Sequence, residues 1–109
     1  MATIEEFEQI EMRVGRVLEA QDFPSARKPA YRLVIDFGPL GQRRSSAQLT
    51  ARYSAEDLVG RQVIAVVNFP PRRIAGFDSE VLVLGVPDEA GEVVLLQPER
   101  AVPPGGRVF

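Results

Sequence analysis

Apolar and polar residues alternate most regularly in residues 31–37. Every second side chain, from Tyr31 to Phe37, is aromatic or aliphatic, which predicts a strand with one face in the core and Arg32 on the other. Residues 43–49 alternate in the same way but are polar, so they place three donor side chains on one face: Arg44, Ser46 and Gln48. Buried hydroxyl and amide groups need partners, so a strand this polar is typical of a sheet edge or a binding face.

Four further segments are predicted to be strands. Residues 12–18 alternate until Val17 and Leu18 adjoin, and Gly15 just before this slip indicates a β-bulge or a strong bend. Residues 63–67 are apolar on both faces, as in a central strand, and residues 81–86 have the same character. Residues 88–91 are predicted to form a hairpin loop that leads into a last strand at residues 93–96.

Two short helical segments are predicted from their capping residues. Residues 54–60 begin with Ser54, continue with two acidic residues and end at a glycine, which is the pattern of a short capped helix. Residues 4–10 are predicted to be a short helix or a turn, with Thr3 and Glu6 spaced as in a capping box. Residues 98–109 are too apolar for a free tail and too irregular for a helix.

The order of these elements predicts an all-β fold. Six or seven short strands, with one short helix between the third and the fourth, match the OB-fold, a five-stranded Greek-key barrel. A two-layered sandwich is the alternative. The apolar strands of the C-terminal half exceed what a small monomeric barrel buries, so we expect extra C-terminal strands to form the interface of a symmetric homodimer. The 109 residues are enough for one domain, which we place at residues 1–109.

Composition excludes several classes of function. The chain has no histidine and no cysteine, which removes the usual zinc ligands and the histidine- and cysteine-based catalytic arrangements. We therefore expect no metal, no cofactor and no enzymatic activity, and binding is the default function. No apolar run is long enough for a membrane helix, and the acidic N-terminal segment is unlike a secretory signal. A cytoplasmic location is expected.

The small net charge of −2 conceals a segregation along the chain. Residues 23–73 carry nine basic and three acidic side chains, a net charge of +6, whereas the segments before and after them each carry −4. A basic middle between acidic ends predicts one positive face that attracts phosphates. The alternative is that the strands interleave in space and the charges mix. Nearly all the cations are arginines, which favour bidentate contacts and stacking.

The connection at residues 68–80 concentrates groups that could bind a ligand. Two prolines end the apolar strand, and Arg72, Arg73 and the Asp78-Ser79-Glu80 run follow. Such a short, stiff connection is where a rigid scaffold displays binding residues, although an ordinary solvated turn would have the same composition. Phe69 is in phase with the preceding strand and is predicted to be core. Glu80 is expected to pair with Arg72 or Arg73.

Two of these stretches resemble the tRNA-binding-domain family. Residues 7–17 (FEQIEMRVGRV) resemble the opening of its members, and residues 68–84 resemble its signature of Asn, Pro-Arg-Arg-Ile, Gly and Ser-Glu. The family includes stand-alone dimeric tRNA-binding proteins and C-terminal appendages of methionyl-tRNA synthetases. The resemblance implies an OB-fold homodimer that binds tRNA.

Three longer stretches, residues 23–38, 45–53 and 67–98, are similar to secretion-associated chaperones of the CsaA type within this family. That resemblance implies a cytoplasmic chaperone that holds unfolded precursor proteins before export, with the translocation motor SecA as a candidate partner. Val81-Leu82 stands where tRNA-binding relatives usually have Gly-Met, and the chain has one lysine. Both departures favour the chaperone over a stand-alone tRNA-binding protein, which remains the alternative.

Both interpretations use one predicted surface. A chaperone needs an apolar pocket, for which Phe69, Ile74 and Phe77 are candidates, although Phe77 could equally be core. For tRNA the arginines would neutralise phosphates, and the scarcity of stacking platforms argues for recognition of shape and charge over base reading. The predicted peptide- or RNA-binding residues are Lys28, Arg32, Arg44, Ser46, Gln48, Asn68, Arg72, Arg73, Phe77, Ser79 and Glu80.

Overall fold

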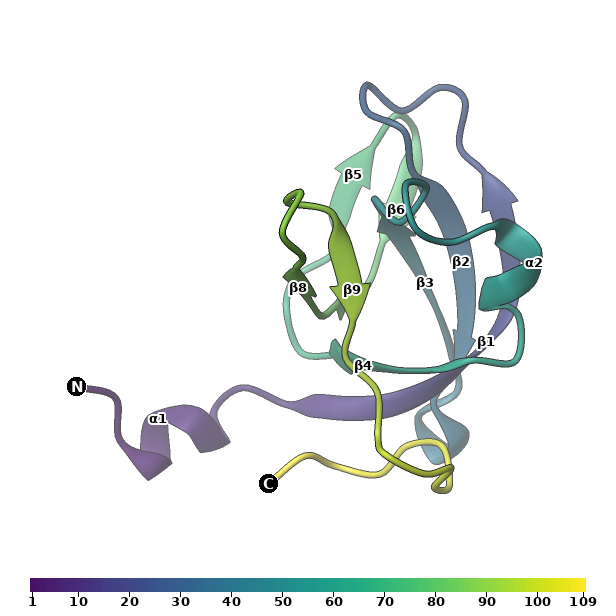
Figure 1. Ribbon diagram of the computed structural model, residues 1–109. Coiled ribbons are helices and arrows are strands. Elements are labelled where there is room, and N and C mark those ends of the chain that lie inside the picture. Colours follow the sequence, from purple (N-terminus) through teal and green to yellow (C-terminus); the bar gives the residue numbers. More distant parts are fainter.

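The computed structural model describes all 109 residues and consists mostly of short strands (Figure 1). In chain order the elements are α1 (Ile4–Glu8), β1 (Met12–Asp22), β2 (Tyr31–Asp36), the 3-10 helix η1 (Gly38–Leu40), β3 (Gln42–Ala47), α2 (Ala55–Leu58), β4 (Gln62–Val66), β5 (Arg72–Ile74), β6 (Phe77–Ser79), β7 (Leu82–Val83), β8 (Gly85–Pro87) and β9 (Val93–Leu95).

Five antiparallel strands form a nearly closed barrel, which confirms the predicted OB-fold. The sheet has the order β3-β2-β1-β4-β7, and the β6–β7 segment returns to β3. Only one backbone hydrogen bond spans this last gap, from the Glu80 N–H to the Arg44 carbonyl (2.8 Å). Three hydrogen bonds that involve side chains also cross the gap. Ser79 Oγ accepts from the Ser46 N–H, Glu80 Oε1 accepts from the Arg44 N–H, and Ser45 Oγ donates to the Val81 carbonyl, each at 3.0 Å.

The core sits inside this barrel and has the composition that the alternating pattern predicts. Leu33 and Ile35 are fully buried on the inner face of β2, as is Phe37 directly after it, and Val63 joins them from β4. Leu58 closes one end, because α2 is held in place by Ser54, whose hydroxyl accepts a hydrogen bond from the Asp57 N–H. Apolar side chains buried from several strands are the main stabilising contribution of such a small barrel.

The slip in β1 is a β-bulge, as predicted. The β1–β2 register shifts between Val17 and Glu19, and Leu18 is left partly exposed there. Gly15 has a different role, since a Cβ at this position would lie 2.4 Å from Ile35 Cγ2 and 2.7 Å from Phe37 Cε1. The glycine therefore allows β1 to approach the core side chains of β2.

The structure corrects two predicted elements. Residues 68–80 are not a simple connection, because β5 and β6 form a hairpin of their own. The predicted strand at residues 81–86 is broken, so that β7 pairs with β4 whereas β8 pairs with β9 around the Asp88–Gly91 loop. The chain bends at Leu84, so the residues before and after the bend pair in different sheets. Periodicity alone does not locate such a bend.

The two ends of the chain lie beside the barrel. α1 has the predicted capping box between Thr3 and Glu6, but it projects from the barrel and buries none of its residues (Figure 1). The C-terminal segment runs along the first half of β1, where it exchanges backbone hydrogen bonds with Met12 and Val14. The Gln62 side chain also bonds both backbone groups of Val102, so this irregular tail is firmly attached.

Candidate ligand-binding surface

The β5–β6 hairpin separates two hollows on the surface of the barrel. It begins after Pro70-Pro71, which cannot extend the ladder of β4. It turns at Ala75 and Gly76, both with positive φ (47° and 80°), as in two-residue hairpin turns of type I′. Ala75 is the one residue other than glycine with positive φ, so the turn accepts some backbone strain to hold the hairpin in place.

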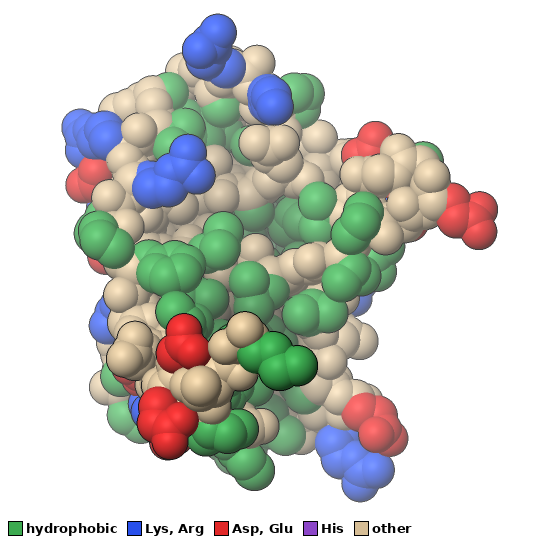
Figure 2. All heavy atoms as spheres, turned by 90° about the vertical axis from the view of Figure 1, so that its left-hand side faces the viewer, with side chains coloured by type: hydrophobic (Ala, Val, Ile, Leu, Met, Phe, Trp, Pro, Cys, Tyr) green, Lys and Arg blue, Asp and Glu red, His purple; other side chains and the backbone are tan.

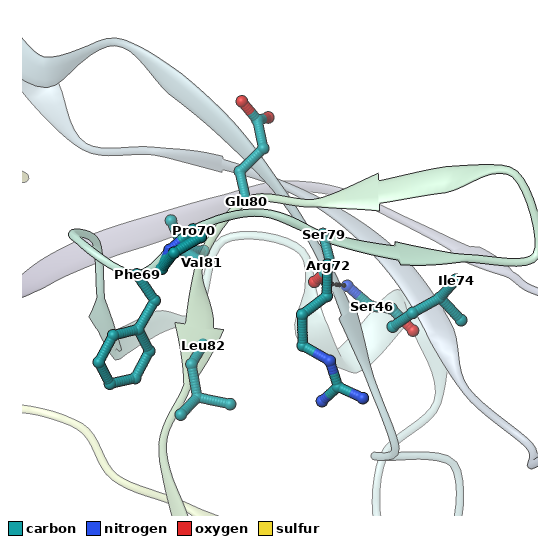
Figure 3. Close-up of a pocket in the computed structure, with 9 residues that line it drawn as sticks. All are labelled: Ser46, Phe69, Pro70, Arg72, Ile74, Ser79, Glu80, Val81 and Leu82. Carbon is teal, nitrogen blue, oxygen red and sulfur yellow. Dashed lines mark hydrogen bonds between the residues drawn. The ribbon is translucent and has the colours of Figure 1, made fainter.

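The first hollow, which we call the apolar hollow, has a volume of about 300 Å³. Its lining residues are Ser46, Phe69, Pro70, Arg72, Ile74, Ser79, Glu80, Val81 and Leu82. Figure 3 shows that Phe69, Leu82 and Arg72 extend on one side of the ribbon, whereas the Glu80 side chain points away from them. Phe69 is 43% exposed and Leu82 47% exposed, so two large apolar side chains face solvent next to an arginine without an ion pair.

The second hollow, which we call the polar hollow, has a volume of about 240 Å³ and lies over the outer face of β1 and β2. It is lined by Glu19, Gln21, Arg32, Leu33, Val34, Arg44 and Phe77. In an OB-fold, the face of the second and third strands, with the loops beside it, binds oligomeric ligands. The two hollows share no lining residue.

Aromatic and guanidinium groups contact one another at the polar hollow, which Arg32, Arg44 and Phe77 line, whereas Phe23 is buried and lines neither hollow. Phe23, from the loop after β1, and Phe77, from the hairpin, meet edge to face with their ring centroids 5.4 Å apart. The Arg32 guanidinium lies over the Phe23 ring at 5.4 Å, and the Arg44 guanidinium lies over the Phe77 ring at 5.3 Å. Cation–π contacts of this kind fix the orientation of the two arginines.

The predicted site residues are distributed over both hollows. Ser46, Arg72, Ser79 and Glu80 line the apolar hollow, and Arg32, Arg44 and Phe77 line the polar hollow. Four others line neither: Lys28, Gln48, Asn68 and Arg73. The Asn68 amide is occupied in attaching the N-terminal segment, since it accepts from the Glu11 N–H (2.9 Å) and donates to the Gln9 carbonyl (2.8 Å).

Two predictions for residues 68–80 are wrong: the ion-pair partner of Glu80 and the core position of Phe69. Glu80 pairs with Arg44 (Nε to Oε1, 3.5 Å) rather than with Arg72 or Arg73. Arg73 pairs with Asp78 (2.9 Å), and the hydrogen bond from this guanidinium lowers the pKa of the Asp78 carboxyl. Phe69 is not core, because the chain turns away from the barrel before the β4 alternation reaches it.

The sequence patterns did not predict several residues that line these hollows, nor the buried contact of Phe23 with Phe77. Glu19 and Gln21 reach the polar hollow because the bulge at Leu18 turns their side chains outward. Phe23 precedes a proline in a loop, and no pattern there predicts its contact with Phe77, which lies 54 positions later. Leu82 reaches the apolar hollow because its strand is at the end of the sheet.

The structure brings together no group of three or more acidic side chains that could hold a metal ion. None of its helices has the length and apolar character needed to cross a membrane.

Comparisons with known proteins identify the family. A family model described as "Putative tRNA binding domain" matches residues 12–107. The chain belongs to the tRNA-binding-domain family. A methionine–tRNA ligase of Methanococcus aeolicus is 34% identical over 105 residues, which are 96% of this chain and 15% of that enzyme. The chain thus spans about 15% of the length of the curated relatives it matches.

Solved structures of the family are similar over the whole chain. The crystal structure of the chaperone CsaA from Bacillus anthracis has a TM-score of 0.94 and 57% identity, and covers 100% of this chain and 99% of that one. The CsaA chaperone protein from Picrophilus torridus has a TM-score of 0.93 and 47% identity, with full coverage of both chains. A methionyl-tRNA synthetase-related protein from Pyrococcus horikoshii has a TM-score of 0.88 and 29% identity.

Proposed function

We propose that this protein is a CsaA-like chaperone that binds extended segments of unfolded precursor proteins in the cytoplasm before their export. The observation that carries the proposal is the apolar hollow, where Phe69 and Leu82 remain exposed beside polar groups. A general chaperone needs such a combination, because apolar side chains of many sequences must bind weakly while polar groups meet the backbone. The full-length similarity to two CsaA chaperones supports it.

We further propose that the chain acts as a homodimer. Val86 in β8, Val94 in β9 and Leu96 directly after it are each between 38% and 49% exposed, and α1 adds Ile4 at 70%. Figure 2 shows hydrophobic side chains in a band across this side of the molecule. A second copy is the occupant that we assign to this band, since a dimer would carry two apolar hollows and a long unfolded chain could span both.

Two further parts of the proposal concern catalysis and a partner protein. No catalytic activity is expected of this chain, because the methionine–tRNA ligases that it resembles match it over only 15% of their length. SecA remains a candidate partner that would receive the bound precursor.

The test is the suppression of aggregation of a chemically denatured protein on dilution, followed by light scattering. Leu82→Ser should raise the chaperone concentration needed for suppression at least about fivefold, because it removes a large apolar contact of about 1.5–3 kcal/mol. Leu18→Ser is the matched control, because Leu18 is also partly exposed (38%) but lines neither hollow. Equal loss in both variants, or no suppression by the unaltered protein, would contradict the proposal.

The second candidate function is tRNA binding, which the family model and the basic residues near the polar hollow favour. Arg27 and Lys28 are exposed on the loop that contains Phe23, and Arg32 and Arg44 line the polar hollow. Contacts of these cations with phosphates would make tRNA binding fall steeply with salt. A salt titration of labelled tRNA, with a permanently unfolded polypeptide as competitor, separates the candidates: steeply salt-dependent binding that the polypeptide cannot displace favours tRNA.

A further inference from the structure

The polar hollow contains polar side chains that have no hydrogen-bond or ion-pair partner in the protein. Arg32 lines it, and its Nε is buried without a hydrogen bond. Glu19 and Gln21 extend from the adjacent strand, where Gln21 is the cross-strand neighbour of Arg32. None of the five ion pairs of the structure involves Arg32 or Glu19. A cationic donor, an anionic acceptor and an amide thus line one hollow without a partner in the protein. Glu19 and Gln21 are exposed, whereas the Arg32 Nε–H is buried, and a buried donor is normally satisfied.

These groups restrict the chemistry of a ligand. A phosphate or carboxylate would suit Arg32 but would face the unpaired charge of Glu19, and the Arg44 charge is already offset by Glu80. A ligand that fits must offer acceptors to the arginine and donors to the carboxylate. It must also be flat, because Phe77 and the guanidinium of Arg44 stacked on its ring form one side of the hollow.

Guanine has this combination. Its N7 and O6 are acceptors that arginine binds in bidentate fashion, and its N1–H and N2–H₂ groups are donors that a carboxylate can accept together. Adenine and cytosine lack the paired donors, and uracil has only one. Unpaired bases of RNA bind by stacking on aromatic rings and arginine planes with hydrogen bonds to their edges.

We propose that the polar hollow is a separate site for an unpaired guanine in single-stranded RNA. The proposal goes beyond the chaperone function and does not depend on it, because the polar and apolar hollows share no residue. It also departs from the sequence-based expectation that RNA recognition would rest on shape and charge alone. Phe77, which carries the Arg44 guanidinium on its ring, supplies the flat surface, and its contact with the buried Phe23 was not predicted from the sequence.

The experiment measures binding of end-labelled UUGUU, UUAUU and UUUUU by fluorescence anisotropy at low salt. We expect UUGUU to bind about tenfold more tightly than the other two, the discrimination typical of one good base contact. Glu19→Gln should remove this preference, and because it also removes a negative charge from the site, the affinity for UUUUU should stay the same or rise. Glu89→Gln, which removes the same charge from an exposed loop outside both hollows, is the control and should keep the preference.

Each outcome decides between the proposals. Equal affinity for the three oligonucleotides would overturn the guanine site and leave RNA binding in place. If no oligonucleotide binds, both the guanine site and RNA binding by this chain are overturned. The chaperone function, which the aggregation assay tests, would be unaffected. Displacement of bound UUGUU by an unfolded polypeptide would show that the two hollows are not independent and would overturn the assignment of separate sites.

Discussion

At the scale of single residues, the side chains of Ser79 and Glu80 make the hydrogen bonds to β3 that a neighbouring strand would otherwise make with its backbone. Ser79 and Glu80 accept the N–H groups of Ser46 and Arg44, which would otherwise face the gap between β3 and the β6–β7 segment. The same two N–H groups belong to residues that line the two hollows. This pair therefore fixes the position of both hollows relative to the barrel.

Ser79→Ala tests this role. The substitution leaves the Ser46 N–H without an acceptor, and an unsatisfied group of this kind costs about 1–3 kcal/mol of unfolding free energy. Urea denaturation should show that loss, whereas Ser25→Ala, in an exposed loop with no hydrogen bond to the side chain, should leave the midpoint unchanged. A Ser79→Ala midpoint equal to that of the unaltered protein would mean that solvent satisfies the group.

Gly15 has no room for a side chain. A Cβ there would overlap Ile35 and Phe37, so Gly15→Ala should cost about 1–3 kcal/mol through overpacking of the core. The melting temperature should fall by about 4–8 °C for each kcal/mol lost. Gly106→Ala is the control, because the nearest atom to its Cβ is 3.6 Å away. Equal melting temperatures for the two variants would show that the core adjusts to the methyl group.

At the scale of elements, the β8–β9 hairpin is organised by a carboxylate in its loop. In β8–β9, Asp88 accepts hydrogen bonds from Arg52 (2.7 Å) and from the Ala90 and Glu92 N–H groups. The hydrogen bond from Arg52 is the largest of the contributions that lower the pKa of Asp88. The ionised carboxylate thus connects the loop to the segment before α2.

The lowered pKa gives this contact a predictable pH dependence. Its stabilising effect is present above the unfolded carboxyl pKa of about 3.9 and is lost as the pH falls through the lower folded value. The melting temperature of Asp88→Asn should therefore be lower than that of the unaltered protein at neutral pH, with the difference disappearing at about pH 2. Glu89→Gln, in the same exposed loop, should show no difference at either pH, and a pH-independent effect of Asp88→Asn would refute the electrostatic explanation.

At the scale of the whole molecule, the apolar band and the barrel are separate parts of the surface. The barrel buries its own core, whereas the band formed by β8–β9 and the residues after it remains exposed in one chain. α1 projects on the same side and buries nothing, although its capping box is complete. An ordered helix that packs on nothing in its own chain fits the proposal of a second copy.

Val94→Glu tests the proposed dimer. A charge in the centre of the band should raise the dimer dissociation constant by at least about 30-fold, the effect of losing one hot-spot contact. Sedimentation measurements should then find monomers at micromolar concentration. Val59→Glu, at the end of α2, is the control for an exposed valine outside the band, and should remain a dimer. Monomers in the unaltered protein would contradict the proposal directly.

The sequence predicted the barrel better than it predicted the site. The alternation at residues 31–37, the cap at Ser54 and the two-sided strand at residues 63–67 all appear as expected, because each depends on neighbouring residues. The binding surface was predicted as one set of residues, and the structure divides it between two hollows. Contacts such as Phe23 with Phe77 join distant loops and have no local signal.

The sequence alone determined the fold class, the inner face of each regular strand and the membership of the family. These follow from periodicity, capping and motifs, which act over a few residues. Only the tertiary structure decided that Glu80 pairs with Arg44, that Phe69 is exposed and that Glu19 lies free beside Arg32. Barrel closure and the β-bulge set these positions, and both depend on how the strands register in space.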